Sequence, residues 1–175
     1  HPTPAANAQF GFSVAVSGDS VLVGAPLDDV GGVADSGAAY LFSADTGSLV
    51  QALAGPGPAG NDQFGFGVAV SEDRILVGTP LDDDRGVVDC GAAHLFSIEM
   101  GELLQTFTNP TSATGDHLGH SVAVSGDLVA VGVPYADYSG KTDTGRVDLF
   151  SASTGQWLRT ITNPGPGSGD RFGFS

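Results

Sequence analysis

The amino-acid sequence predicts an all-β fold made of β-propeller blades, each blade a four-stranded antiparallel sheet. Three observations support this prediction. One segment recurs at a constant interval of 54 residues. Each copy contains four short runs rich in Val, Leu, Ala and Phe, separated by Gly, Pro, Asp and Ser, which is the pattern of strands joined by turns. No stretch of useful length shows the period of an amphipathic helix.

The repeat is clearest where it begins with an aromatic residue and a glycine. FGFSVAV at residue 10 returns as FGFGVAV at 64, as LGHSVAV at 118 and as FGFS at 172. The chain therefore divides without gaps into 1–9 as the tail of a preceding repeat, 10–63, 64–117 and 118–171 as three blades, and 172–175 as the start of a further repeat. Because roughly four to eight blades close a propeller, we expect a partial propeller or one completed by other copies of the chain.

Within the first copy we expect strands at 13–16, 21–23, 38–43 and 49–54. The first two strands are joined by a tight turn, and so are the last two, where DTG at 45–47 supplies a glycine for a hairpin. The other connections are long. Since successive connections of an up-and-down sheet alternate between its two ends, all the long loops should share one face, which we call the long-loop face. Long loops on a rigid scaffold are where binding usually resides.

The charge balance limits the partners that this chain can have. Its 6 Lys and Arg residues against 20 Asp and Glu residues give a net charge of −14, which provides no basic footprint for nucleic acid or anionic lipid. No apolar run is long enough to insert into a membrane. Of the acids 17 are Asp, a residue that favours turns, so the acids should lie in loops. The single cysteine, Cys90, forms no intramolecular disulfide.

The motifs of each copy resemble the FG-GAP repeat, the blade of the integrin α-subunit head propeller and of many bacterial extracellular proteins. The resemblance rests on an FG motif followed by a GAP motif, present as FG at 10 with GAP at 24, FG at 64 with GTP at 78, and LG at 118 with GVP at 132. It implies a propeller fold and an extracellular or cell-surface binding role. The calcium loop of the integrin type, between the first and second strands, is absent, because only SGDS at 17–20 stands there.

Acidic residues repeat in the loops between the second and third strands. Each loop has the pattern Asp, two residues, Gly, two residues, Asp, with the acids Asp29 and Asp35, Asp83 and Asp89, Asp137 and Asp143. Carboxylates around a glycine turn could supply the oxygen ligands that Ca²⁺ prefers, so these six residues form a candidate metal site. The alternative is that they cap turns by accepting backbone N–H groups. Further acids expected on this face are Asp28, Asp82, Asp84, Asp62 and Asp116.

The residues capable of catalytic chemistry form no recognisable set. His120 occupies a column of phenylalanines and is expected to pack, whereas His94 alternates with Tyr and Asp in its column and is expected on an exposed strand position. Cys90 has no histidine column beside it, and Trp157 aligns with leucines, which indicates blade packing. The sequence therefore predicts no catalytic residue and no enzyme.

Together these observations favour a non-enzymatic binding or adhesion module, extracellular or at the cell surface, with Ca²⁺ as its only candidate cofactor. Its expected partner is a protein or other macromolecule at the long-loop face. One alternative is a structural repeat protein that self-assembles into a fibre or surface layer through its blade edges, with other copies of itself as partners. Another is a propeller appendage of a hydrolase.

Overall fold

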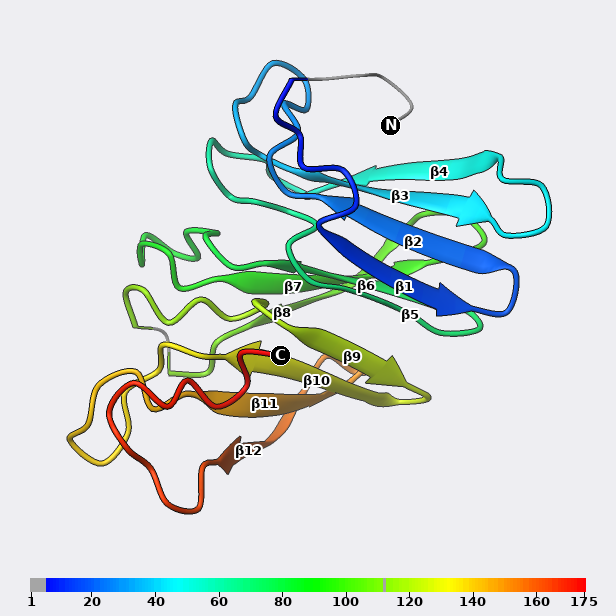
Figure 1. Ribbon diagram of the computed structural model, residues 1–175. Helices are drawn as coiled ribbons and strands as arrows, with labels where there is room; N and C mark the ends of the chain where they lie inside the picture. Colours follow the sequence, from blue (N-terminus) through cyan, green and yellow to red (C-terminus); the bar gives the residue numbers. More distant parts are fainter. Residues whose placement is uncertain (1–5, 112) are drawn as a thin grey trace.

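The computed structural model describes residues 6–111 and 113–175, which form three four-stranded antiparallel sheets that follow one another like the blades of a fan (Figure 1). The described residues contain no helix. The strands of the first blade are β1 (Ser13–Ser17), β2 (Ser20–Ala25), β3 (Ala38–Ser43) and β4 (Leu49–Ala54). Those of the second are β5 (Val68–Val70), β6 (Arg74–Thr79), β7 (Ala92–Ser97) and β8 (Leu103–Thr108). Those of the third are β9 (Val122–Ser125), β10 (Leu128–Val133), β11 (Arg146–Ser151) and β12 (Trp157–Thr162).

Within each blade the strands pair in chain order, as the sequence predicts. The predicted third and fourth strands of the first copy coincide with β3 and β4. The second strand is longer than expected, because Gly24 and Ala25 continue the ladder by pairing with Ala39 and Ala38. Glycine is unfavourable in strands in general, so this extension needs a packing reason.

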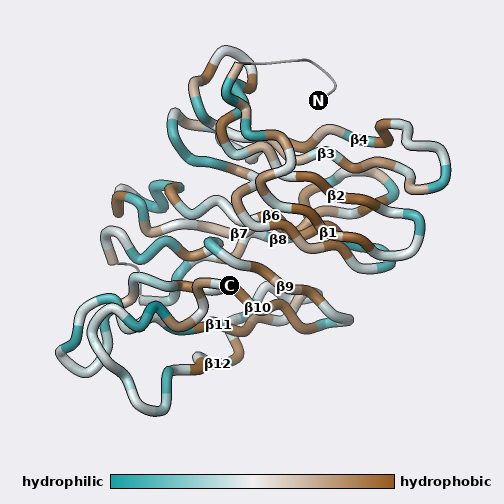
Figure 2. Tube along the Cα trace, in the orientation of Figure 1, coloured by the Kyte–Doolittle hydropathy of each residue, from teal (hydrophilic) through white to brown (hydrophobic). Residues whose placement is uncertain are grey.

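The core lies between the blades, because adjacent residues of a strand face opposite sides of its sheet. Leu22 and Leu41 of the first blade pack against Phe64, Ile75 and Val77 of the second. The interface of the second and third blades is built in the same way, with Leu76, Leu95, Phe107, Val129, Val131 and Phe150 among its buried side chains. Burial of each such side chain is worth about 1.5–3 kcal/mol. Figure 2 shows apolar residues along the strands and polar ones in the loops and turns.

The contact between neighbouring blades explains why the FG and GAP motifs keep the same spacing in each repeat of this chain. Gly65 has a φ of 94° and lies over β2, where its carbonyl oxygen accepts a hydrogen bond of 2.8 Å from the Ser13 hydroxyl. A Cβ atom on Gly24 would lie 2.0 Å from this oxygen, so no larger residue fits there. Gly119 approaches Gly78 in the same way. The FG turn of the next blade therefore packs directly against the glycine of each GAP motif.

A row of aromatic rings in tilted contact lies near the start of the first strand of each blade. The ring centroids of Phe12 and Phe66 are 4.7 Å apart, those of Phe66 and His120 are 4.6 Å apart, and those of His120 and Phe174 are 4.3 Å apart. β1 packs beside β5, and β5 beside β9, so the row crosses all three blades. The prediction that His120 is a packing residue is confirmed.

Candidate binding face

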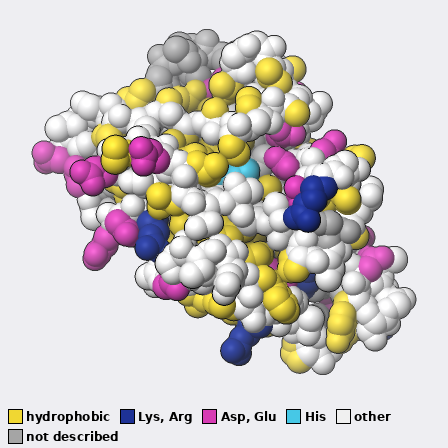
Figure 3. Space-filling view, turned by 180° about the vertical axis from the view of Figure 1, so that it is seen from behind, with side chains coloured by type: hydrophobic (Ala, Val, Ile, Leu, Met, Phe, Trp, Pro, Cys, Tyr) yellow, Lys and Arg dark blue, Asp and Glu magenta, His cyan; other side chains and the backbone are white. Residues whose placement is uncertain are grey.

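The long loops gather at one end of the molecule and the tight turns at the other (Figure 1). The loops within the blades span 26–37, 80–91 and 134–145, and those that lead out of a blade begin after β4, β8 and β12. This arrangement is the long-loop face that the sequence predicts. Acidic side chains are present at both ends of the molecule (Figure 3), so charge alone does not distinguish the long-loop face from the turn end.

Hydrogen bonds tie the long loop within each blade to the segment that leads from that blade into the next repeat. The backbone N–H groups of Gln63 and Phe64 donate to the carbonyl oxygens of Asp35 and Ser36, at 3.2 and 3.0 Å. The same two bonds recur one blade further on, from His117 to Asp89 and from Leu118 to Cys90, and again from Arg171 to Asp143 and from Phe172 to Thr144. Because each loop is bonded in this way, we call the long-loop face a hydrogen-bonded mesh rather than a set of independent loops.

The six acids of the candidate metal site are brought together in pairs within their own loops. Asp29 Oδ1 accepts the backbone N–H of Asp35 at 2.9 Å, and the pairs Asp83–Asp89 and Asp137–Asp143 make the same bond at 2.8 and 2.9 Å. The second residue of each pair has a φ of 50° or 51°, in the left-handed region. The first of each pair is exposed. These are the bonds that the turn-capping alternative requires.

Metal binding by these loops stays a prediction. Among residues 6–111 and 113–175, no three His, Cys, Asp or Glu side chains lie together in a way that could hold a metal ion. Each pair presents its carboxylates from one loop, so a cation there would need backbone oxygens as additional ligands.

Three of the other acids expected on this face lie below its surface. Asp28, Asp62 and Asp116 are buried. Asp28 accepts a hydrogen bond from the Tyr40 hydroxyl, and Asp62 accepts the backbone N–H of Ala59 at 2.6 Å. These carboxylates therefore hold the loops in place.

Burial and crowding shift the pKa values of the acids between the first two blades. Desolvation, followed by repulsion from Asp62, Asp84 and Asp83, raises the pKa of Asp82 to about 6. Desolvation also raises the pKa of Asp62, although its hydrogen bond from Ala59 acts in the opposite direction. Asp84 forms an ion pair with Arg85 at 3.0 Å. The loop of the second blade thus concentrates negative charge.

The expectation that His94 is exposed is wrong, since only 2% of its surface is accessible. The other members of its column, Tyr40 and Asp148, are buried as well, and each residue of the column has a different polar partner within its own blade. Nδ1 of His94 lies 3.2 Å from the Thr106 hydroxyl, and its ring packs on Phe64. Desolvation lowers the pKa of His94 to about 4. Variation of residue type in this column reflects different buried partners and not solvent exposure.

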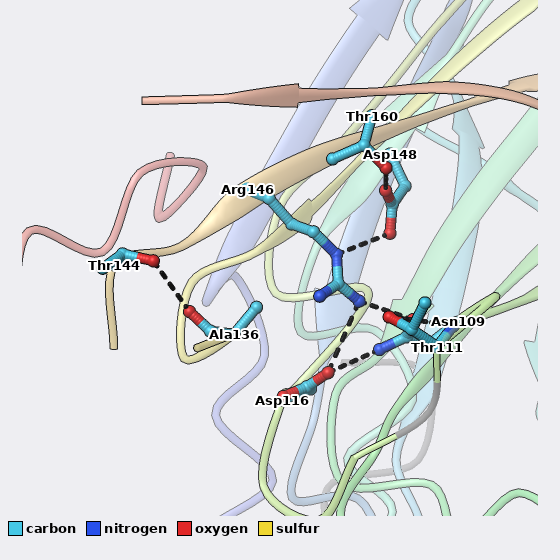
Figure 4. A network of polar contacts seen from close by, with 8 residues as sticks. All are labelled: Asn109, Thr111, Asp116, Ala136, Thr144, Arg146, Asp148 and Thr160. Atoms are coloured by element: carbon cyan, nitrogen blue, oxygen red, sulfur yellow. Dashed lines mark hydrogen bonds and ion pairs between the residues drawn. The ribbon is translucent and has the colours of Figure 1, made fainter. Parts of the chain in front are cut away.

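The third blade has a buried ionic network where the other blades have simpler contacts (Figure 4). Arg146 Nε donates to Asp148 Oδ2 at 3.0 Å, and its Nη2 donates to Asn109 and, at 3.4 Å, to Asp116. The Thr160 hydroxyl donates to the other oxygen of Asp148. Desolvation raises the pKa of Asp116, although the Arg146 charge and the hydrogen bonds from Asn109 and Arg146 lower it. Nothing in the local sequence pattern indicates this network, because its members come from two blades.

The sequence interpretation of Trp157 as a packing residue like the leucines of its column stays a prediction. Trp157 is 49% exposed, against 42% for both Leu49 and Leu103 in the same column. Its position near the outer edge of the blade leaves half of its surface accessible. The structure therefore places a large aromatic side chain at the molecular surface, beside the Arg146 network.

Antiparallel four-stranded sheets packed face to face, with strands in chain order and an FG turn seated on each GAP strand, define the class as propeller-type repeat proteins. The chain belongs to the FG-GAP repeat family, whose model matches residues 4–42, 48–96 and 104–150. A search of the curated proteins finds no match to this chain.

Among solved structures, the chain is similar to the computationally designed Ika8 protein, with a TM-score of 0.55 and 16% sequence identity. The match covers 87% of this chain and 36% of the designed chain, so this chain spans about a third of that protein's length. At this identity the likeness concerns the fold alone. Within the described residues, no helix has the length and apolar character of a membrane span.

Proposed function

We propose that this chain is a non-enzymatic binding or adhesion module, extracellular or at the cell surface, which presents its long-loop face to another macromolecule. The observation that supports this most is the mesh of hydrogen bonds that joins the loop within each blade to the segment leading into the next repeat. A surface that is already ordered loses little conformational entropy when a partner binds, which favours recognition over a large area.

The exposed edge of this mesh has a repeated chemistry. Asp29, Asp83 and Asp137 each use Oδ1 to cap their own loop, and the described residues provide no hydrogen bond to their Oδ2 atoms. Three such carboxylates at equivalent places on three blades suit a cationic surface of a partner, or one bridged by Ca²⁺ as a proposed cofactor.

We take the module to be non-catalytic because the groups with the right chemistry are used in packing. Cys90 is buried, and desolvation raises the pKa of its thiol, which disfavours the reactive thiolate. His94 is buried, and His117 and His120 pack against aromatic rings. A hydrolase with this propeller as an appendage would need catalytic residues outside these blades.

Self-assembly into a fibre or surface layer is the second candidate. It is favoured by the apolar side chains that the first blade leaves open, of which Val14 and Val16 are 66% and 67% exposed. Association by this route would bury apolar surface and pair strand edges, and would not depend on the loop carboxylates.

The experiment compares two charge-matched variants of the full chain. The first replaces Asp29, Asp83 and Asp137 by Asn, whose amide oxygen can still cap each loop. The second replaces Asp19, Asp73 and Asp127, at the tight turns, by Asn. Each removes three negative charges, one set from each end of the molecule. Binding of labelled protein is measured on immobilised extracellular matrix proteins and polysaccharides, with Ca²⁺ and with chelator.

We expect wild type to bind at least one probe, the loop variant to lose at least tenfold in affinity, and the turn variant to bind like wild type. Equal loss in both variants would indicate unspecific charge attraction and contradict the proposal. Light scattering on the same samples tests the second candidate, which requires assembly of wild type and of the loop variant alike.

A further inference from the structure

A groove of about 430 Å³ lies between the second and third blades, at the border of the long-loop face. It is lined mainly by apolar surface that includes Pro110, Tyr138 and Trp157, with Arg146 and Asp148 among its polar groups. Small-molecule sites typically have about 300–1,000 Å³, a mostly apolar lining and a few polar groups that orient the ligand. The groove has these three properties.

The repeat itself provides a reference for what a blade needs. Around this groove the third blade departs from the other two at several positions, although the blades have the same strands. The residues of the third blade, each with its counterparts in the first and second, are Arg146 for Ala38 and Ala92, Asp148 for Tyr40 and His94, Trp157 for Leu49 and Leu103, and Tyr138 for Val30 and Asp84. Packing of a blade does not require these side chains, because two blades form without them.

Arg146 is held so that part of its guanidinium remains available to a ligand. Nε and Nη2 are fixed by Asp148, Asn109 and Asp116, and the side chain is 13% exposed. Nη1 has no hydrogen-bond partner among the described residues, and Figure 4 shows it on the side of the guanidinium opposite Asn109. Its two N–H groups are donors at a fixed position beside the groove.

The charges around the groove favour a ligand without charge. The positive charge of Arg146 is already balanced by the carboxylates of Asp148 and Asp116, at 3.0 and 3.4 Å. Asp137 adds a further carboxylate to the lining. An anionic ligand would face these carboxylates and a chain of net charge −14, whereas a purely apolar ligand would leave the Nη1 donors without an acceptor.

The aromatic side chains specify the shape of the ligand. Trp157 and Tyr138 are 49% and 50% exposed, and both line the groove. Their rings offer flat apolar surfaces, and the indole N–H and phenol hydroxyl offer polar contacts at the edges. A ligand that complements them has a flat face of C–H groups and a rim of hydroxyl or ether oxygens.

We propose that this groove binds an uncharged carbohydrate, with a sugar ring packed on Trp157 and an oxygen of the sugar accepting from Arg146 Nη1. This inference rests on the proposed binding function and names a ligand class for one site beside the long-loop face. It would make at least one partner of the module a glycan.

The test uses the full chain and a set of neutral and acidic methyl glycosides and oligosaccharides, with saturation-transfer NMR as the binding readout. Trp157 is the only tryptophan, so its fluorescence reports directly on ligand in this groove. We expect at least one neutral glycan to bind and to change the fluorescence, and no comparable binding of acidic glycans.

The variants are taken from the repeat so that the blade still folds. Trp157→Leu introduces the residue of the other two blades, and Arg146→Ala with Asp148→His reproduces the second blade. Each should weaken binding at least tenfold. Leu158→Ala, on the same strand but outside the groove lining, is the matched control and should bind as wild type does.

Absence of any neutral-glycan binding, or binding that both groove variants retain, overturns the proposal. A preference for acidic glycans in the fluorescence assay overturns it as well. The proposed function fails separately, since it depends on the loop carboxylates: a chain that binds a protein through Asp29, Asp83 and Asp137 but binds no glycan would support the function and refute this inference.

Discussion

A hydrogen bond from a serine side chain joins an FG turn to the preceding blade at two of the three contacts. The contact can be tested by introducing this bond at the third. Ser13 and Ser121 donate their hydroxyl hydrogens to the carbonyl oxygens of Gly65 and Gly173, at 2.8 and 2.9 Å. The second blade has Gly67 at the same place, so the carbonyl of Gly119 lacks this donor. We predict that Gly67→Ser stabilises the protein.

The expected magnitude combines two effects. A net hydrogen bond contributes about 0.5–1.5 kcal/mol, and replacing glycine at an ordinary φ removes unfolded-state entropy worth about 0.4–1 kcal/mol. A Cβ at Gly67 would lie 3.1 Å from the carbonyl oxygens of Gly119 and His120, a tight contact that offsets part of the gain. The backbone bond from Gly78 to Gly67, at 2.8 Å, equals the bond to Ser121 in the third blade, so the position is shaped for serine. We expect a net gain of about 1–2 kcal/mol.

The assay is urea unfolding of wild type, Gly67→Ser and Gly67→Ala. Alanine receives the entropic gain and the same tight contact but no hydrogen bond, so the difference between the two variants isolates the bond. Serine should exceed alanine by about 0.5–1.5 kcal/mol. Equal stability of the two variants would refute the claim that this hydroxyl joins neighbouring blades.

Two further predictions concern buried positions. Because the pKa of His94 is about 4 in the fold against 6.5 when unfolded, the stability that its neutral form provides above pH 6.5 is lost as the pH falls towards 4, by about 3 kcal/mol. In urea unfolding, the stability of His94→Gln relative to wild type should therefore rise by that amount between pH 7 and pH 4. A difference in stability that does not change with pH would contradict the prediction. Carboxyl groups with raised pKa values affect both proteins equally, so their effect cancels in the difference. Gly24→Val should cost at least about 3 kcal/mol because its side chain meets the Gly65 carbonyl, whereas Asp19→Asn, which keeps an acceptor oxygen at the tight turn, should change stability by less than about 0.5 kcal/mol. Similar losses of stability in Gly24→Val and Asp19→Asn would show that the contact between the FG turn and the preceding blade is not close-packed.

The blades could be predicted from sequence because their causes are local and repeated. The period, the runs of β-branched and apolar residues and the glycine turns all lie within one copy, and the strands follow from them. Turn capping by Asp29 can be predicted as one of two alternatives for the same reason, since donor and acceptor are six residues apart.

The contacts between blades could not be predicted in this way. Arg146 donates a hydrogen bond to Asn109, 37 residues away, and no local sequence pattern predicts that pairing. The column of Tyr40, His94 and Asp148 looked variable and hence exposed, although each residue is buried with its own partner. The residues around the groove were missed for this reason. The signal that could have found them is departure from the repeat at positions that neighbouring blades bring together.

The central claim is that the long loops form one rigid mesh across the blades, and native-state amide hydrogen exchange tests it most directly. The N–H groups that donate to the loop within each blade should be strongly protected although they lie outside strands: those of Gln63, Phe64, His117, Leu118, Arg171 and Phe172. The N–H groups at the exposed loop tips serve as the internal reference and should exchange fast: those of Gly32, Gly86 and Gly140. Protection of the first group at the level of the strands is the predicted result. Exchange of both groups at the same fast rate would show independent loops and contradict the account.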